Sequence, residues 1–471
     1  MDGSKVKPET TCRESNDMAA RSGSGSQPAV GGVLWRETFS SQNVLAALGQ
    51  VEANKGAPGP DGMTVEELRP WLKSHWRDVR RRLDDGMYRP GPVRRVTISK
   101  PGGGFRLLGV PDVLDRLICQ CVARTLSELF DPGFSESSYG FRPGRSAHDA
   151  VLAAKGYIAD GYLFGVALDL DSFFDRVQHD VLMARVARKV DDKALLRLIG
   201  RYLRAGVMDG GICMASTVGT PQGSPLSPIL SNIILDDLDR ELEGRGHRFV
   251  RYADDIHIYV GSRRAAERVM ASTADYVERR LKLVVNRDKS KVDEAKNLTL
   301  LGFRFFLPGG QVKIRVSPES WKRLKDKLRF LTGRARGVSM WRRIGEINRL
   351  IIGWVGYYGL AETPYPFKDT DGWLRRRLRQ VRWREWKRFA ARRRNLLAAE
   401  TLTAEQATRC AASSRSAWRI AHTAPLQIAL PNDYWRDLGL ACLEDERTRC
   451  QARITNRRMR TRTYGGVGGA R

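Results

Sequence analysis

The chain of 471 residues is too long for one ordinary hydrophobic core and predicts several domains, while its hydrophobic content of 42% is that of a folding protein. No apolar run is long enough to cross a bilayer, and the polar N-terminus lacks the pattern of a secretion signal, so we expect no membrane association. The formal net charge of +28 predicts a polyanionic partner, because binding would offset the cost of so much self-repulsion.

The excess charge lies mainly in the last third of the chain. Residues 311–471 contain 36 Lys and Arg against 14 Asp and Glu, a net charge of +22, which leaves only +6 for residues 1–310. A solvated, solubilising surface is the alternative interpretation of such a region. We favour a large polyanion bound mainly by this part of the chain.

The first third of the chain alternates between loops, helices and a hairpin. Residues 1–35 are polar, rich in Ser and Gly and without periodicity, which predicts a disordered lead. Helical patterning runs from about Trp35 to Ala53, and a second amphipathic helix follows the loop NKGAPGPDG. Residues 93–111 predict two strands joined by a Gly-rich turn, and residues 112–130 predict a helix.

The middle of the chain mixes strands with long helices. The segment 163–177 begins as a buried strand and ends in acidic residues, and 219–242 predicts a Pro/Gly turn leading into a helix. A strand pair at 248–260, a helix at 264–282 and short strands around 298–305 follow. This mixture predicts an α+β domain over about residues 36–312.

Beyond this domain the pattern becomes helical and basic. Apolar residues recur at helical spacing in SWKRLKDKLRFL, in WRRIGEINRLIIGWVGYYG and in a third helix at 371–394, whose exposed face is strongly cationic. We expect a helical domain at 313–400. Residues 401–471 form a basic extension that could bind DNA.

Two adjacent carboxylates interrupt the strand pair. The sequence has four Asp-Asp pairs, but only Asp254 and Asp255 have strand-like residues on both sides, which is typical of a hairpin turn. Such a pair is costly unless a cation neutralises it. Asp169, at the end of the strand 166–170, could complete a site for divalent cations with oxygen ligands. We expect Asp171 and Asp175, the nearby alternatives, to cap a helix or to be solvated.

The motifs, taken in order, resemble those of reverse transcriptases. VALDLDSFFD, GTPQGSPLSP, RYADD, LKLVVNRDKS and LGFRF follow the order of a polymerase palm. NKGAPGPDGMT, SKPGGGFRLLGVPDVLDR, SYGFRPGRSAHDA and the tail SSRSAWRIAHTAPLQIALPNDYWRDLGL resemble one branch, the group II intron-encoded reverse transcriptase/maturases. The resemblance covers roughly residues 36–440. It implies a right-hand polymerase fold, with fingers and palm at 36–312 and a thumb/maturase domain at 313–400.

The resemblance also implies roles for individual residues. Asp169, Asp254 and Asp255 correspond to the catalytic residues, which hold two Mg²⁺ ions for which Mn²⁺ can substitute. The residues implied for binding the nucleoside triphosphate are Lys100, Arg106, Phe174, Gln222 and Lys289. Phe174 would reject a 2′-hydroxyl, whereas we expect its neighbour Phe173 to belong to the core. For Lys289 a solvated surface charge is nearly as good an interpretation.

Other residues are interpreted from their pattern. Strand alternation predicts that His257 points away from the acidic pair, so we interpret it as structural, and Arg142 could equally be an internal cation. Six cations of the third basic helix are expected to track RNA phosphates: Arg375, Arg376, Arg377, Arg379, Arg384 and Lys387. The HNH nuclease of some family members is not visible, because the last three cysteines lack its paired spacing.

The function expected from this pattern is RNA-directed DNA synthesis together with maturation of a host intron RNA and retrohoming by target-primed reverse transcription. The expected partners are group II intron RNA, a DNA target, a primer and dNTPs. A homodimer is a further alternative that the sequence leaves open. A CRISPR-linked or retron-like reverse transcriptase and a polymerase-dead splicing factor are the alternatives. The seven cysteines form no C-x-x-C pair, which suits the reducing bacterial cytoplasm.

Overall fold

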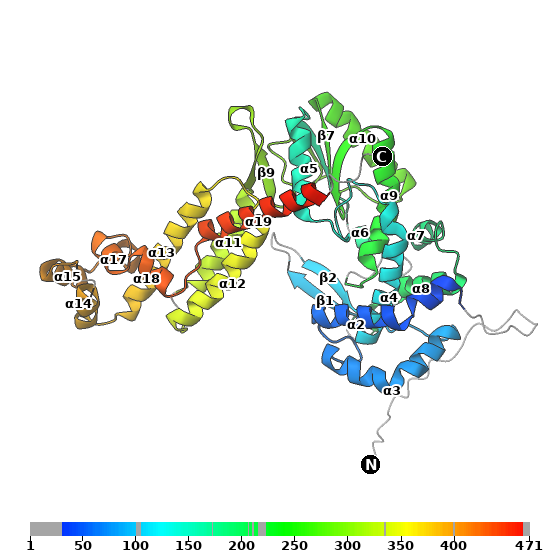
Figure 1. The fold of residues 1–471 in the computed structure, drawn as a ribbon, viewed down its shortest axis with the longest axis horizontal. Coiled ribbons are helices and arrows are strands. Elements are labelled where there is room, and N and C mark those ends of the chain that lie inside the picture. Colours follow the sequence, from blue (N-terminus) through cyan, green and yellow to red (C-terminus); the bar gives the residue numbers. More distant parts are fainter. Residues whose placement is uncertain are drawn as a thin grey trace, which may run out of the picture.

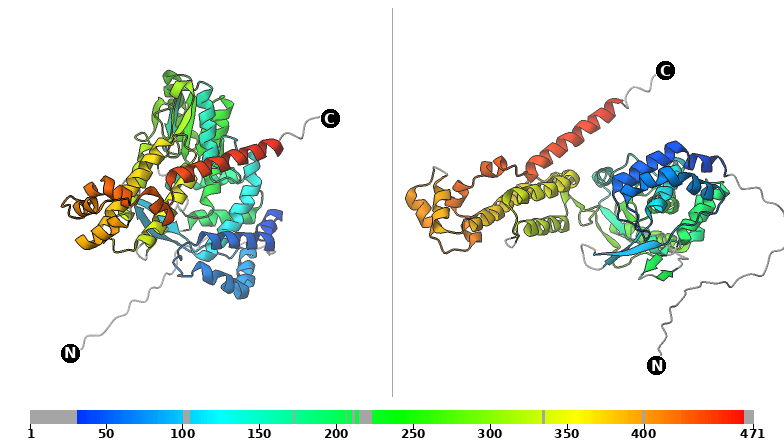
Figure 2. Two further views of the ribbon diagram at one scale, coloured as in Figure 1. Left: turned by 60° about the vertical axis from the view of Figure 1, so that its left-hand side comes forward. Right: turned by 90° about the horizontal axis from the view of Figure 1, so that it is seen from below.

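The computed structural model describes most of the chain beyond residue 30: residues 31–99, 105–171, 173–205, 207–209, 212–214, 223–333, 336–398 and 401–464. Strands and helices alternate up to β10, and the described residues after β10 form only helices and their connections. The helices after β10 form an arm that extends away from the mixed part of the molecule (Figures 1 and 2). The predicted α+β fold followed by a helical region is therefore confirmed.

The N-terminal lobe contains four helices and a small sheet. Its helices are α1 (Val33–Thr38), α2 (Ser41–Asn54), α3 (Val65–Asp84) and α4 (Val113–Phe130). The predicted hairpin is confirmed as β1 (Val93–Ser99) and β2 (Phe105–Val110), which pair with β4 (Val207–Asp209) and β5 (Ile212–Met214) in the order β2-β1-β4-β5. The single helix predicted near residues 35–53 is instead two helices, because Ser40 caps the start of α2 through the amide of Asn43.

The second sheet carries the predicted acidic hairpin. It has the order β6-β7-β3-β8, formed by β3 (Phe164–Leu168), β6 (Arg248–Tyr252), β7 (Asp255–Val260) and β8 (Lys291–Glu294). One face, with Val166, Leu168, Ile256 and Ile258, belongs to the main hydrophobic core, and α10 (Arg263–Arg280) packs against it. The helices that complete this region are α5 (Ala147–Ala159), α6 (Phe173–Arg176), α7 (His179–Val186), α8 (Lys193–Arg204) and α9 (Ser227–Gly244).

The arm begins after a short hairpin, β9 (Phe303–Phe306) and β10 (Lys313–Val316). Its first three helices are α11 (Pro318–Leu331), α12 (Met340–Tyr358) and α13 (Tyr365–Glu385). Its remaining helices are α14 (Phe389–Leu397), α15 (Ala404–Ala411), α16 (Ala417–Ile420), α17 (Ala424–Ala429), α18 (Asn432–Asp437) and α19 (Leu443–Tyr464). No helix in the described ranges is long and apolar enough to cross a membrane.

The predicted single helix at 371–394 is wrong in its boundaries. Helix α13 ends at Glu385, and the chain bends before α14. The Arg392 guanidinium closes this bend, because it lies 4.6 Å from the centre of the Trp383 ring and donates to the carbonyl of Trp386 over 2.9 Å. The bend buries Leu396 completely, which a straight helix would have carried away from the arm.

Helix α5 contacts the arm through two polar side chains. His148 on α5 contacts the carbonyl oxygen of Tyr357 at 2.6 Å, and Lys155 on the same helix pairs with Glu362 at 2.8 Å. Helix α19 then returns along α12. Its start is fixed by Asp371, whose carboxylate accepts the amides of Leu443 and Glu444.

A buried charged network ties the acidic hairpin to α9. Arg251 on β6 and Asp239 on α9 are fully buried, and the Arg251 Nε donates to Asp239 Oδ1 over 2.7 Å. The same guanidinium donates to Asn232, to Ser138 and to the carbonyl of Ala253 inside the turn, at 2.9, 2.7 and 3.1 Å. Because the guanidinium contacts several elements at once, it fixes the turn relative to the helix behind it.

Asp239→Ala should lower the free energy of unfolding by about 3–5 kcal/mol, because it leaves the buried Arg251 charge without its partner. Urea unfolding of the full chain followed by circular dichroism measures this change. The control is Glu267→Ala, which removes an exposed carboxylate that pairs with Arg263 and should leave the unfolding midpoint unchanged. Equal midpoints for the two variants would contradict the role given to this network.

Candidate active site

The acidic pair lies at the tip of a tight hairpin, as the sequence predicted. Tyr252 pairs with Asp255 across β6 and β7, so the turn consists of only Ala253 and Asp254. Ala253 adopts a φ of 57°, a left-handed conformation that is unusual for a residue with a side chain. Gly140 lies directly against this turn, where a Cβ would come within 2.3 Å of the Ala253 nitrogen. The turn is therefore held from outside as well as by the Arg251 network.

Asp169 lies beside the hairpin, although 85 residues separate it from Asp254 in the numbering. Strand β3 pairs antiparallel with β7, with Ala167 opposite His257 and Leu168 opposite Ile256. Extending this register by one residue puts Asp169 opposite Asp255, on the face of the sheet away from the core. The backbone at Asp169 is fixed by the amide of Asn286, which donates to its carbonyl over 2.9 Å.

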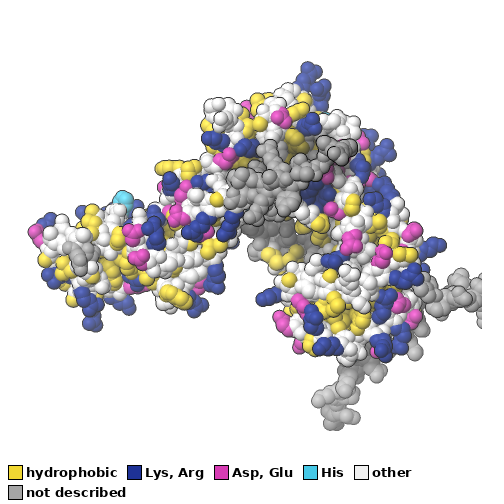
Figure 3. Space-filling model, viewed as in Figure 1, with side chains coloured by type: hydrophobic (Ala, Val, Ile, Leu, Met, Phe, Trp, Pro, Cys, Tyr) yellow, Lys and Arg dark blue, Asp and Glu magenta, His cyan; other side chains and the backbone are white. Residues whose placement is uncertain are grey.

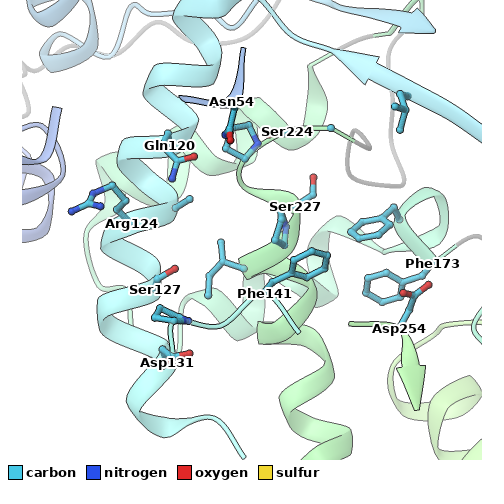
Figure 4. A pocket seen from close by; sticks show the side chains of 18 of the residues that line it. Asn54, Gln120, Arg124, Ser127, Asp131, Phe141, Phe173, Ser224, Ser227 and Asp254 are labelled. Atoms are coloured by element: carbon cyan, nitrogen blue, oxygen red, sulfur yellow. The ribbon is translucent and has the colours of Figure 1, made fainter. Parts of the chain in front are cut away.

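A cleft of about 1150 Å³ opens at this end of the sheet. Asp169 and Asp254 line it together with Phe174 and Lys289. The opposite wall is helix α4, and Figure 4 shows the labelled side chains of α4 across the cleft from Asp254 and Phe173. The cleft thus separates a pair of carboxylates from a polar helix face, with room for a large ligand between them.

Two of the acids in this site each lie close to a side-chain nitrogen of a Lys or His residue. Lys289 Nζ lies 3.5 Å from Asp169 Oδ2, and His257 Nε2 lies 3.0 Å from Asp255 Oδ1. The Asp169 and Asp255 side chains remain 40% and 42% exposed, so both can reach a ligand in solution.

The donor set suits hard divalent cations, which prefer carboxylate oxygens. Reverse transcriptases in general use divalent metals. In the described part of the chain, however, no three acidic, His or Cys side chains are gathered closely enough to form a ready metal cluster. Asp169, Asp254 and Asp255 therefore fit a cation by chemistry and position, but their side chains would have to draw together around it.

The residues implied for nucleotide binding are only partly described. Phe174 lines the cleft and stands edge-on to Phe173, with ring centres 5.1 Å apart. Phe173 is 3% exposed and belongs to the main core, as expected. Lys100 and Gln222 lie outside the described residues. Arg106 pairs with Ile98 in the hairpin, but its side chain is not described either.

Several cleft residues were missed by the sequence analysis. Gln120, Arg124, Ser127 and Asp131 line the cleft at spacings of four, three and four residues from α4 and its end, which is the signature of one helix face. The spacing of these four polar residues is visible in the sequence and is enough to predict that they share one face. Phe141 also lines the cleft, 50% exposed and with a φ of 59°, and no sequence signal separates it from a core Phe.

Arg142 is an internal structural cation. Its guanidinium donates to Asp131 over 2.7 Å and to the carbonyls of Ser135 and Ser138, and its side chain is only 4% exposed. These contacts shape the loop that presents Phe141 to the cleft.

One further expectation is corrected. His257 does not face away from the acidic pair, because residues two apart on a strand share a face and its ring contacts Asp255. Asp171 lines the cleft and pairs with Arg176 at 2.7 Å, while the side chain of Asp175 is not described.

The basic arm contains fewer free cations than its sequence suggests. Arg379 is 7% exposed and donates to the carbonyl of Leu430, and burial lowers its pKa to about 10. The prediction that Arg379 contacts an RNA phosphate is therefore wrong. Arg376 stacks 3.9 Å from the centre of the Trp418 ring. Arg384 and Lys387 are exposed, and Figure 3 shows Lys and Arg side chains along the arm.

Comparison with protein families agrees with this geometry. Residues 98–305 match the reverse transcriptase (RNA-dependent DNA polymerase) family, and residues 321–398 match the group II intron maturase-specific domain. The first match contains the cleft acids, and the second covers the arm from α11 to α14.

Individual proteins also resemble this chain in sequence. Protein YkfC of Escherichia coli is 32% identical over 54% of this chain and 77% of its own length. The group II intron-encoded protein LtrA of Lactococcus lactis is 33% identical over 44% of this chain, and the putative COX1/OXI3 intron 2 protein of Saccharomyces cerevisiae is 27% identical over 55%. The alignments span only 34% and 37% of these two longer proteins.

The reverse transcriptase domain makes the chain an RNA-directed DNA polymerase, and the maturase-specific domain accounts for the first part of the helical arm, from α11 to α14. Together, the acidic hairpin beside β3, the two family matches and the relatives show that this chain belongs to the group II intron-encoded reverse transcriptases and maturases.

Proposed function

We propose that Asp169, Asp254 and Asp255 form the catalytic centre of an RNA-directed DNA polymerase that also binds its host group II intron RNA and supports retrohoming. The observation that carries the catalytic assignment is the common position of the three acids. Asp169 and Asp254 line one cleft, and the register of β3 and β7 leads Asp169 to Asp255.

The three carboxylates would hold two Mg²⁺ ions. When bound, these ions lower the pKa of a primer 3′-hydroxyl and neutralise charge on the leaving pyrophosphate. The chain's own residues provide the ligands and their orientation. Lys289, beside Asp169, is available to contact the leaving phosphates, and its side chain is 65% exposed.

The remaining nucleotide contacts are assigned from the fingers hairpin and the loop before α9. We assign Lys100 and Arg106 to the triphosphate, Gln222 to the nascent base pair and Phe174 to the sugar. The position of Phe174 in the cleft that Asp169 also lines supports its role as a steric gate.

We propose three functional segments: fingers and palm at 36–312, a thumb/maturase domain at 313–400, and a basic extension at 401–471 that contacts DNA. The disordered lead predicted at 1–35 is wrong for residues 33–35, which belong to helix α1, and its first 30 residues lie outside the described part of the chain. The net charge of +22 on residues 311–471 supports binding of intron RNA mainly through the arm. Exposed cations such as Arg384 and Lys387 are better candidates for phosphate contacts than the buried Arg379.

The double variant Asp254→Ala/Asp255→Ala should reduce DNA synthesis on a poly(rA) template by more than about 100-fold. Losing the proposed metal ligands should lower the activity more than losing residues that only orient such ligands would. Binding of intron RNA should persist, since the arm would carry it. Primer extension with Mg²⁺ and dTTP and a filter-binding assay measure the two activities. Glu267→Ala/Asp275→Ala on α10 removes the same charge from an exposed helix and should leave both unchanged.

Phe174→Ala should admit ribonucleotides, because the smaller side chain no longer excludes a 2′-hydroxyl. The ratio of kcat/KM for dTTP to that for UTP should fall on the order of 10–200-fold, the range of a shape-based pocket. Phe330→Ala, which truncates a 70%-exposed aromatic on the arm, is the control and should keep the ratio. An unchanged ratio in the Phe174 variant would remove its assigned role.

Arg384→Ala/Lys387→Ala should weaken binding to the intron RNA transcribed from the DNA around the gene. The dependence of log Kd on log salt concentration should become shallower by about 1 for each phosphate that the variant no longer neutralises. Arg263→Ala/Arg264→Ala removes two exposed cations from α10 and should not change this slope. Equal slopes for the two double variants would contradict RNA binding by the arm.

A further inference from the structure

A fully buried histidine occupies the middle of the catalytic hairpin. On β7, Ile256, Ile258 and Val260 face the main core, so Asp255, His257 and Tyr259 share the other face. His257 is 1% exposed, and its neighbours on the adjacent strands are Ala167 and Val250. An imidazole is thus enclosed with an apolar side chain directly opposite it on each flanking strand.

The hydrogen bonding of this ring is one-sided. Its Nε2 lies 3.0 Å from Asp255 Oδ1, whereas its Nδ1 is buried without a hydrogen-bond partner among the described residues. An ionised carboxylate can only accept, so Nε2 carries the hydrogen and donates it to Asp255. Burying the unpaired Nδ1 costs stability that an apolar ring of similar size would avoid. Among the described hydrogen bonds of this ring, the one with Asp255 is the interaction that offsets this cost in stability.

The two carboxylates opposite each other at the end of the sheet have different supports. Asp169 is approached by Lys289, whose long side chain is 65% exposed and can adopt many conformations. Asp255 is instead held by a ring that packing has immobilised. One oxygen of Asp255 is therefore fixed while its side chain remains 42% exposed toward solvent.

We propose that His257 is a positioning residue for the reaction: it fixes the rotamer of Asp255 so that the second carboxylate oxygen is directed at the cation before substrate binds. This inference rests on the proposed function, because it takes Asp255 as a ligand. Hydrogen bonds from enclosed side chains commonly orient metal-binding carboxylates, and their loss weakens metal binding.

The test compares His257→Phe with His257→Gln in the full-length protein. Phe keeps a ring without a donor, whereas the Gln side-chain amide can reach the place of Nε2 and donate. The probe is Mn²⁺, titrated into the protein alone and followed by the electron paramagnetic resonance signal of the free ion. His257→Phe should raise the Kd for Mn²⁺ about 10–100-fold, and His257→Gln should stay within about threefold of the original protein.

Three readouts separate positioning from packing. The unfolding midpoint of His257→Phe should be equal to or above that of the original protein, because the unpaired Nδ1 is gone. Equal Mn²⁺ affinity of His257→Phe and the original protein would overturn the proposal, and so would equal weakening in both variants together with lower unfolding midpoints. Asp255→Ala is measured alongside: if it leaves Mn²⁺ binding and primer extension intact, the ligand assignment itself fails, independently of His257.

Discussion

The acidic hairpin depends on a single buried ion pair between Arg251 and Asp239. A two-residue turn with a left-handed Ala253 would not by itself keep two carboxylates at a fixed place, because it contains one unfavourable backbone conformation and two like charges. The Arg251 guanidinium contacts the turn carbonyl, helix α9 and Ser138 simultaneously. Since all its partners lie in the interior, the network transfers the rigidity of the core to an exposed tip.

This support explains how the sheet can carry acids at its edge. The core face of β3 and β7 is continuous and apolar, while the opposite face presents Asp169, Asp255 and His257 at one end. Period-2 alternation lets one strand serve both purposes, because adjacent residues point to opposite sides. The stability gained on one face permits repulsion on the other, and we propose that bound cations relieve this repulsion during catalysis.

In the arm, by contrast, many Arg side chains stabilise the fold through internal contacts. Arg392, Arg376 and Arg379 close a bend, stack on an indole and bond a distant carbonyl. Net charge therefore overstates the number of cations that can meet phosphates. The planar guanidinium suits these internal tasks because it can stack and donate at once, which a Lys ammonium cannot. The exposed cations are consequently the informative ones for RNA binding.

The sequence by itself determined the change from a mixed region to a helical one, the hairpin that carries Asp254 and Asp255, and the burial of Phe173, because these follow from local periodicity and turn chemistry. Only the tertiary structure decided that α4 forms the opposite wall of the cleft, that Arg379 is internal and that His257 contacts Asp255. Periodicity tells which residues share a face of an element. It does not tell which other element packs against that face, since this choice depends on contacts between segments far apart in the chain, as between Asp169 and the hairpin.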